Sequence, residues 1–250
     1  MRAAWLLVAA AAAFAQKPEF VRIPAGAFTM GCEAAEPCAK SLPKKVVAVA
    51  AFEMAKYEVT VAEFRRFVRA TGYRTDAEKA GEARTWRSPD FRLSDRQPVV
   101  FLSLNDAEAY CASIGARVPV EAEWEYASRA GSTTYHYWGE EIDGRYLWYF
   151  GNSKERPMPV GLKLPNAWGL FDVEGNAMEW MRGGGPHTSI TKEGTGSPRG
   201  GSYAMCPEPY PPVNGVRQRM MGLGPTFRGF ENSNFRREER RYDFGVRCAR

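Results

Sequence analysis

The chain has 250 residues, of which 44% are hydrophobic and 13% aromatic, and its formal net charge is +5 at pH 7. Such a composition can bury a sizeable core in one large domain. The charge is mild, and the one dense basic stretch, Arg236–Arg241, contains two glutamates, which favours a solvated face over a nucleic-acid site. We therefore expect no nucleic-acid partner.

The first residues have the features of a secretory signal peptide. Arg2 supplies a short positive region, the apolar run AAWLLVAAAAAF follows, and Ala13-Phe14-Ala15 fits the small-x-small cleavage rule. The run is too short to span a bilayer, and the order of these features favours a signal peptide over a membrane anchor or a buried helix. We expect residues 1–15 to be removed. A single domain, residues 16–250, is then secreted or periplasmic, with no membrane span after cleavage.

Short strands are predicted first, followed by a helix. Phe20–Gly31 predicts two short strands around a Gly turn, and the apolar, β-rich run Lys45–Ala55 predicts one buried strand. Thr60 and Glu63 have the spacing of a capping box and Gly72 is a stop signal, so we expect a helix between them. One apolar face of this helix is predicted to join the core: Val61, Phe64, Phe67 and Val68.

Two further helices are predicted in the middle of the chain. Leu104–Gly115 has Asn105 as its candidate N-cap and ends at a glycine. The stretch PVEAEWEYASRAG follows, with Pro119 suited to a first helical turn and Glu121 and Glu123 near the positive end of the helix dipole. Beyond it Gly, Pro, Asn and aromatic residues dominate, which predicts irregular loops and short strands.

Seven phrases occur in series along the chain: IPAGAFTMG, YEVTVAEFRRFVRATGY, QPVVFLSLNDAEAYC, ARVPVEAEWEYASRAG, PNAWGLFDVEGNAMEW, RGGSY and FGVRCA. Together they resemble the formylglycine-generating enzyme family, also called the sulfatase-modifying-factor domain, over roughly residues 20 to 250. The resemblance implies an α+β fold, a variant of the C-type-lectin-like fold with little regular secondary structure. It also implies an oxidoreductase that acts on a protein or peptide cysteine.

The cysteine count is odd, so at least one of the five cysteines lacks an intrachain partner. Cys32 and Cys38 flank the short loop CEAAEPC, which a disulfide could close. The resemblance implies another bridge, between Cys111 in the AYC segment and Cys248 near the C-terminus. Two buried free thiols are the alternative for this pair, and export favours the disulfide.

The segment DVEGNAMEW holds two carboxylates with a Gly-Asn pair between them. Taken alone, it is compatible with a β-turn that carries solvated acids. The resemblance implies a structural calcium ion, and hard cations favour such oxygen ligands. The implied ligands are the Asp172 side chain, the Gly175 and Ala177 carbonyls, and Glu179. The family's second calcium loop is not recognisable, so no second ion is predicted.

Enzymes of the resembled family hold Cu(I) between two cysteines of a GGSYxCxxxxC stretch, because soft thiolates suit this ion. Here the stretch reads GGSYAMCPEPYPP. Met205 occupies the first cysteine position in an ungapped alignment, and Cys206 follows one residue later. Tyr210 or Pro211 stands at the second position. The resemblance also implies that Ser202 lines the substrate groove, while the missing thiolate puts the standard conversion of cysteine to formylglycine in doubt.

Three interpretations of Cys206 stay open. It is a structural thiol, partly buried or bridged to another chain; it is part of a Cu(I) site with Met205, Met220 or Met221; or it is a redox-active thiol without a metal. The chain's two histidines are too few for a three-histidine iron site. It also lacks HExxH, CxxC, GxSxG and nucleotide-binding motifs.

Two hypotheses of function follow. The first is an exported oxidoreductase of the formylglycine-generating type, acting on a protein or peptide, with Cys206 as its reactive or copper-binding thiol and Ser202 in its groove. The alternative is a non-catalytic envelope binding module on the same fold. It would use the same groove, with contacts from Trp148, Tyr149, Tyr210 and the inserted loop 219–241.

Overall fold

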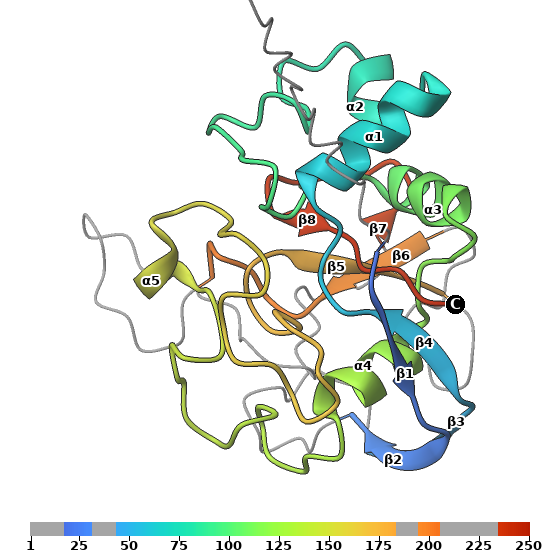
Figure 1. Cartoon of the computed structure of the whole chain (residues 1–250), viewed down its shortest axis with the longest axis vertical. Helices are drawn as coiled ribbons and strands as arrows, with labels where there is room; N and C mark the ends of the chain where they lie inside the picture. Colours follow the sequence, from blue (N-terminus) through green and yellow to red (C-terminus); the bar gives the residue numbers. More distant parts are fainter. Residues whose placement is uncertain (1–17, 32–43, 184–194, 206–234) are drawn as a thin grey trace, which may run out of the picture.

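The computed structural model describes residues 18–31, 44–183, 195–205 and 235–250. The predicted signal peptide lies outside these residues, as does the predicted disulfide between Cys32 and Cys38, and so does Cys206. Within the described part, short helices and strands alternate with long irregular stretches (Figure 1). No helix in this part is long and apolar enough to cross a membrane.

The N-terminal region forms two antiparallel strand pairs. Strand β1, Phe20–Ile23, pairs with β4, Phe52–Ala55, and strand β2, Gly26–Met30, pairs with β3, Lys45–Val49. The two strands predicted around a Gly turn are therefore present, although each pairs with a later segment rather than with the other.

The prediction of one buried strand over Lys45–Ala55 is wrong. The segment forms two strands, β3 and β4, that belong to different sheets. Side chains alternate across β3, so that Val46 is 69% exposed while Val47 is 2% exposed. A continuous apolar run predicts a strand that is buried on both faces, but only one face of β3 packs against the core.

Helix α1, Val61–Thr71, confirms the prediction made from its capping box. The Thr60 side chain accepts from the Glu63 amide, and the Glu63 carboxylate accepts from the Thr60 amide at 2.8 Å. Gly72 ends the helix with a positive φ of 69°, a conformation that glycine adopts without strain. The four residues predicted to face the core are all buried.

Helix α3, Leu104–Ser113, begins one residue before the predicted cap. Ser103 is the N-cap, and its side chain accepts from the Asp106 amide at 3.1 Å. Asn105 lies inside the first turn and its amide donates to Asp76 instead, at 2.9 Å. The choice of Asn105 was wrong because Ser103 and Asp106 have the three-residue spacing of a capping box.

Helix α2, Asp76–Lys79, and helix α4, Glu121–Arg129, are each short. The N-cap of α4 is Val120, so Pro119 precedes the helix rather than occupying its first turn. A four-residue helix, α5 at Phe150–Ser153, is the one helix described after α4. The rest of that half confirms the prediction of loops and short strands.

The remaining strands form one sheet in the order β7-β6-β5-β8. The strands of this sheet are β5 (Met178–Arg182), β6 (Thr195–Arg199), β7 (Phe235–Arg236) and β8 (Phe244–Gly245). In Figure 1 the sheet lies between helices α1, α2 and α3 on one side and α4 with β1–β4 on the other. Two hydrophobic clusters fill these two spaces, with Trp180 in the first and Trp124 in the second.

Cys111 and Cys248 form a disulfide, as the resemblance implies. Both are buried, and the bond joins α3 to the C-terminal segment across 137 positions of sequence. The C-terminal segment also hydrogen-bonds to β4, where the Ala55 amide donates to the Cys248 carbonyl at 2.8 Å. Elements that are distant in sequence are thus fixed to one another beside the core.

Candidate functional site

The RGGSY phrase packs directly against the DVEGNAMEW phrase. The Gly175 amide donates to the Gly200 carbonyl at 2.8 Å, and the Tyr203 amide donates to the Asn176 carbonyl at 2.8 Å. Gly200 has a φ of 91°, and a Cβ there would lie 2.9 Å from the Val173 carbonyl oxygen. The double glycine therefore permits the close approach of these two segments.

Ser202, the predicted groove residue, is fully enclosed in this assembly. Its hydroxyl donates to Oδ2 of Asp243 at 2.9 Å and accepts from the Ala204 amide at 3.3 Å. Burial raises the pKa of Asp243 above its ordinary value, and Oδ1 of this carboxylate has no hydrogen-bond partner. Sequence reasoning missed Asp243, although it stands beside the FGVRCA phrase.

Met205, the predicted copper ligand, is only 8% exposed and belongs to the first hydrophobic cluster. Its carbonyl accepts from the Phe150 amide at 2.8 Å. Because its thioether is packed in the hydrophobic core, Met205 does not fit the role of a second sulfur ligand for Cu(I). Cys206, the other residue assigned to this site, lies beyond the described part of the chain.

Three acids surround one buried arginine in the centre of the fold, and we call this group the core acid cluster: Glu58, Asp172, Glu179 and Arg247. All four side chains are at most 1% exposed. Arg247 donates from Nε and Nη2 to Oε1 of Glu179, at 2.9 and 2.7 Å. Glu58 accepts from the Ala177 amide at 2.8 Å and from the Asn176 side chain at 2.6 Å. One guanidinium thus balances three carboxyl groups.

Burial, together with the neighbouring acids, raises the pKa values of Glu58 and Asp172. Burial, followed by the charges of Asp172 and Glu179, raises the pKa of Glu58 well above its ordinary value. Burial likewise raises the pKa of Asp172 to about 6, against a hydrogen bond from the Gly161 amide that lowers it. The second oxygen of Asp172, Oδ1, is buried and has no hydrogen-bond partner.

The described side chains do not fit the predicted calcium site. Both oxygens of Glu179 are occupied, because Arg247 contacts each of them and the Trp124 indole donates to Oε2 at 2.5 Å. A guanidinium bonded to a ligand carboxylate would repel a divalent cation at the same oxygens. Asp172 has an oxygen to offer, but the described residues contain no group of three or more His, Cys, Asp or Glu side chains arranged around a metal ion.

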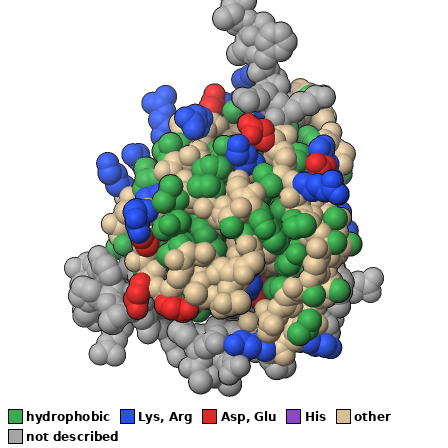
Figure 2. Space-filling model, turned by 60° about the horizontal axis from the view of Figure 1, so that its bottom comes forward, with side chains coloured by type: hydrophobic (Ala, Val, Ile, Leu, Met, Phe, Trp, Pro, Cys, Tyr) green, Lys and Arg blue, Asp and Glu red, His purple; other side chains and the backbone are tan. Residues whose placement is uncertain are grey.

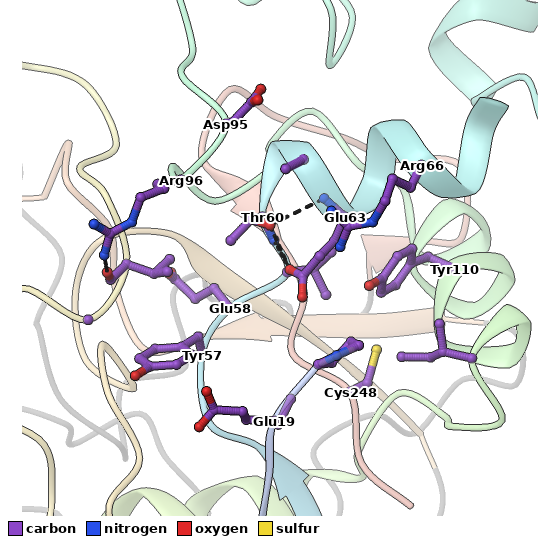
Figure 3. Close-up of a pocket in the computed structure, with 17 residues that line it drawn as sticks. Glu19, Tyr57, Glu58, Thr60, Glu63, Arg66, Asp95, Arg96, Tyr110 and Cys248 are labelled. Carbon is purple, nitrogen blue, oxygen red and sulfur yellow. Dashed lines mark hydrogen bonds between the residues drawn. The ribbon is translucent and has the colours of Figure 1, made fainter. Parts of the chain in front are cut away.

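A cavity of about 410 Å³ lies beside the core acid cluster and is called the pocket below (Figure 3). Its wall comes from the segment after β4, the first turns of α1, the loop before Gln97, helix α3 and Cys248. Glu58 lines it, and so does Gly161, whose amide donates to Asp172 at 2.7 Å. Among the residues of Figure 3, Glu63, Tyr110 and Arg96 come from three different segments.

Trp148 and Tyr149, predicted as groove contacts, lie next to the DVEGNAMEW segment. The Trp148 carbonyl accepts from the Asn176 amide at 2.8 Å, and Lys163 places Nζ 3.6 Å from the centre of the Trp148 ring. Tyr149 is partly buried against the first hydrophobic cluster. Both residues therefore lie beside the enclosed Ser202 assembly, while Tyr210 lies outside the described residues.

The chain matches the family described as sulfatase-modifying factor enzyme 1-like domain over residues 7–250. It belongs to this family. The bovine formylglycine-generating enzyme is 35% identical over 214 residues, which cover 65% of this chain and 57% of the bovine protein. The enzyme from Streptomyces coelicolor is 32% identical, with 76% of this chain and 80% of that protein covered.

The chain is also similar to a protein that is named inactive and to a solved structure. The mouse protein named inactive C-alpha-formylglycine-generating enzyme 2 is 34% identical, over 66% of this chain and 69% of that protein. Among solved structures, PvdO from Pseudomonas aeruginosa has a TM-score of 0.68 and 28% identity, covering 93% of this chain and 94% of that one. The fold is therefore that of the formylglycine-generating enzymes, as predicted.

Proposed function

We propose that this chain is an exported oxidoreductase-type member of the family that acts on a cysteine of a protein or peptide. The packing of RGGSY against DVEGNAMEW supports the proposal. Its backbone hydrogen bonds fix residues 199–205, and Cys206 follows them directly in the sequence. The hydrogen bond between Ser202 and Asp243 provides a buried polar contact beneath this segment. Cys206 is the reactive thiol in this proposal.

The standard copper-dependent conversion is not the reaction that we propose. The phrase offers one cysteine where the resemblance implies two, and Met205 is packed in the core. A single thiolate reacts instead by exchange or oxidation, chemistry that follows the exposure and the protonation of the sulfur.

The test uses the purified chain without residues 1–15 and a peptide that contains a Cys-x-Pro-x-Arg motif. With glutathione disulfide present, which is reduced to two glutathione thiols as it takes up two electrons and two protons, we expect the peptide to form a mixed disulfide with the chain, detected by intact mass spectrometry. Replacing Cys206→Ser should abolish the adduct, whereas replacing Ser202→Ala should slow its formation. Formylglycine in the peptide, at a yield that falls when Cu(I) is chelated, would contradict this proposal.

The alternative is a non-catalytic binding module, and two observations favour it. One relative at 34% identity is named inactive. Figure 2 also shows a face, brought forward from the side of β2, β3 and α4, where hydrophobic side chains gather centrally and most Lys and Arg lie towards the margins. A module of this kind would bind the peptide reversibly, and Cys206→Ser would leave its affinity unchanged.

A further inference from the structure

The pocket contains several charged side chains whose bonds are already made. Glu19 pairs with Lys56 at 2.9 Å, and Asp95 pairs with Arg65; neither of these two cations lines the pocket. Both oxygens of Glu58 accept hydrogen bonds from the polypeptide inside the core. Glu58 therefore has no oxygen left for a ligand, while Glu19 and Asp95 are 47% and 66% exposed and each pairs with a cation outside the pocket.

Glu63 differs from Glu58 in its hydrogen bonds and from Glu19 and Asp95 in its burial, because it is only partly exposed. Its Oε2 atom completes the capping box with Thr60, while its Oε1 atom makes no hydrogen bond with any described residue. In Figure 3 the carboxylate points from α1 toward the middle of the pocket. A carboxylate oxygen only accepts hydrogen bonds, so a partner at Oε1 must be a donor.

Tyr110 adds a second polar group to the same space. Its side chain is 2% exposed, and no described residue hydrogen-bonds to its hydroxyl. The hydroxyl points from α3 into the pocket (Figure 3). Burial, followed by the charge of Glu63, raises the pKa of Tyr110, so the phenol keeps its proton and remains a donor. A hydroxyl that lines a pocket and has no partner among the described residues can complete its hydrogen bond with a ligand or water.

Cationic groups stand elsewhere on the wall. Arg96 lies across the pocket from Tyr110 in Figure 3, and among described residues its guanidinium contacts the Val160 carbonyl, at 3.5 Å. Arg66 lines the pocket one turn of α1 beyond Glu63. The ring of Tyr57 forms the wall between Arg96 and Glu19. The pocket thus offers an acceptor with a negative charge at Glu63 and a donor with a positive charge at Arg96.

We propose that the pocket binds a small zwitterion of the α-amino-acid class, with its ammonium group at Glu63 and its carboxylate at Arg96. The volume of about 410 Å³ falls within the range of small-molecule sites. The Tyr110 hydroxyl supplies an additional donor to the ligand. None of residues 199–205 lines the pocket, so the proposal is independent of the function proposed above.

The first experiment screens the standard L-amino acids one at a time, at millimolar concentration, by isothermal titration calorimetry with the purified full domain. At least one amino acid should bind. Two analogues of that amino acid, the amine without the carboxylate and the carboxylic acid without the ammonium group, should each bind about tenfold more weakly or worse. Each analogue loses one charged contact with the pocket. Failure of every amino acid to bind, or equal binding of the amine alone, would overturn the proposal.

The second experiment uses a matched pair of variants that the chain itself offers. Thr75 and Glu78 form a second capping box, at α2, and Glu78 does not line the pocket. Glutamine also serves in a capping box, so Glu63→Gln and Glu78→Gln should both fold. We expect Glu63→Gln to weaken binding about ten- to a hundredfold, and Glu78→Gln to leave it unchanged.

Tyr110→Phe tests the hydroxyl alone, since the ring and its packing remain. Its affinity should fall by about two- to tenfold, the loss expected for one neutral hydrogen bond. Unchanged affinity in both Glu63→Gln and Tyr110→Phe would show that the amino acid binds elsewhere and would overturn the assignment of the pocket.

Discussion

The core acid cluster and the pocket contain the same kinds of side chain and meet at Glu58, but they use them differently. In the cluster, buried carboxylates accept from Arg247, Trp124 and backbone or side-chain amides, and a single oxygen of Asp172 is left without a partner. In the pocket, Glu63 Oε1 and the Tyr110 hydroxyl make no hydrogen bond with a described residue, and both face an open space. Carboxylates that the polypeptide itself encloses indicate a structural role, whereas polar atoms that line an open pocket can bind a ligand.

The disulfide is expected to make the largest contribution of any single feature. Replacing both Cys111→Ala and Cys248→Ala should lower the free energy of unfolding by about 4–5 kcal/mol, because the bridge closes a long loop in the unfolded chain. Urea titration of the double variant measures this loss. Retention of wild-type stability would show that the bond constrains little beyond what the core already fixes.

Arg247→Met should be nearly as destabilising. The substitution leaves three buried carboxyl groups without a counter-charge, which costs about 3–5 kcal/mol. Arg250→Met is the matched control, since Arg250 pairs with Glu53 at 2.7 Å on the surface; its loss should cost about 1 kcal/mol or less. Equal effects of the two variants in urea titrations would mean that burial adds nothing to the cluster.

The capping box of α1 and its apolar face could be predicted from sequence because both depend on residues three or four positions apart. The core acid cluster could not, because its members stand at positions 58, 172, 179 and 247 and meet only through the fold. The resemblance located the segment that contains Asp172 and Glu179. The resemblance implies that Asp172 and Glu179 bind calcium. The pairing of Glu179 with Arg247 could not be predicted, because Arg247 lies 68 positions away in the sequence.

The same limit applies to the candidate site. Ser202 could be placed in a functional phrase from sequence, but its enclosure by Asp243 and by the turn around Gly200 required the structure. The pocket gave no sequence signal at all. Glu63 was interpreted as a capping residue, which it is, and Tyr110 as part of a helix, so nothing indicated that their remaining polar atoms face a common cavity.

Asp172→Asn tests the titration of the cluster. The pKa of Asp172 is raised from 3.8 to about 6, so the folded protein holds this proton more tightly than the unfolded chain does. The associated stability is fully present below pH 3.8 and is lost as the pH rises through 6. Relative to Asp172→Asn, the wild type should lose about 2–3 kcal/mol between these limits.

The measurement is a series of urea titrations of both proteins across this range of pH. Asp90→Asn is the control, because it removes the same charge from an exposed position paired with Arg84. A stability difference between wild type and Asp172→Asn that does not vary with pH would show that the carboxyl group titrates normally, and the contrast between cluster and pocket would then lose its electrostatic basis.

Glu63→Gln should leave the free energy of unfolding within about 0.5 kcal/mol of wild type, since the amide preserves the capping box. The same small change is expected for Glu78→Gln. Thermal unfolding without ligand measures both. A large loss of stability in Glu63→Gln alone would mean that the charge of Glu63, like that of Glu179, stabilises the fold. The pocket would then not differ from the cluster at this residue.

Calcium is expected to have the smallest effect of all. Glu179 is bonded to Arg247 through both oxygens, so millimolar calcium should not shift the unfolding temperature of the wild type, and a chelator should not lower it. Differential scanning calorimetry with and without the ion provides the measurement. A stabilising shift that disappears in both Asp172→Asn and Glu179→Gln would show that the ion displaces the guanidinium. The cluster would then be a ligand site like the pocket, in which Arg247 occupies the Glu179 oxygens in the absence of calcium.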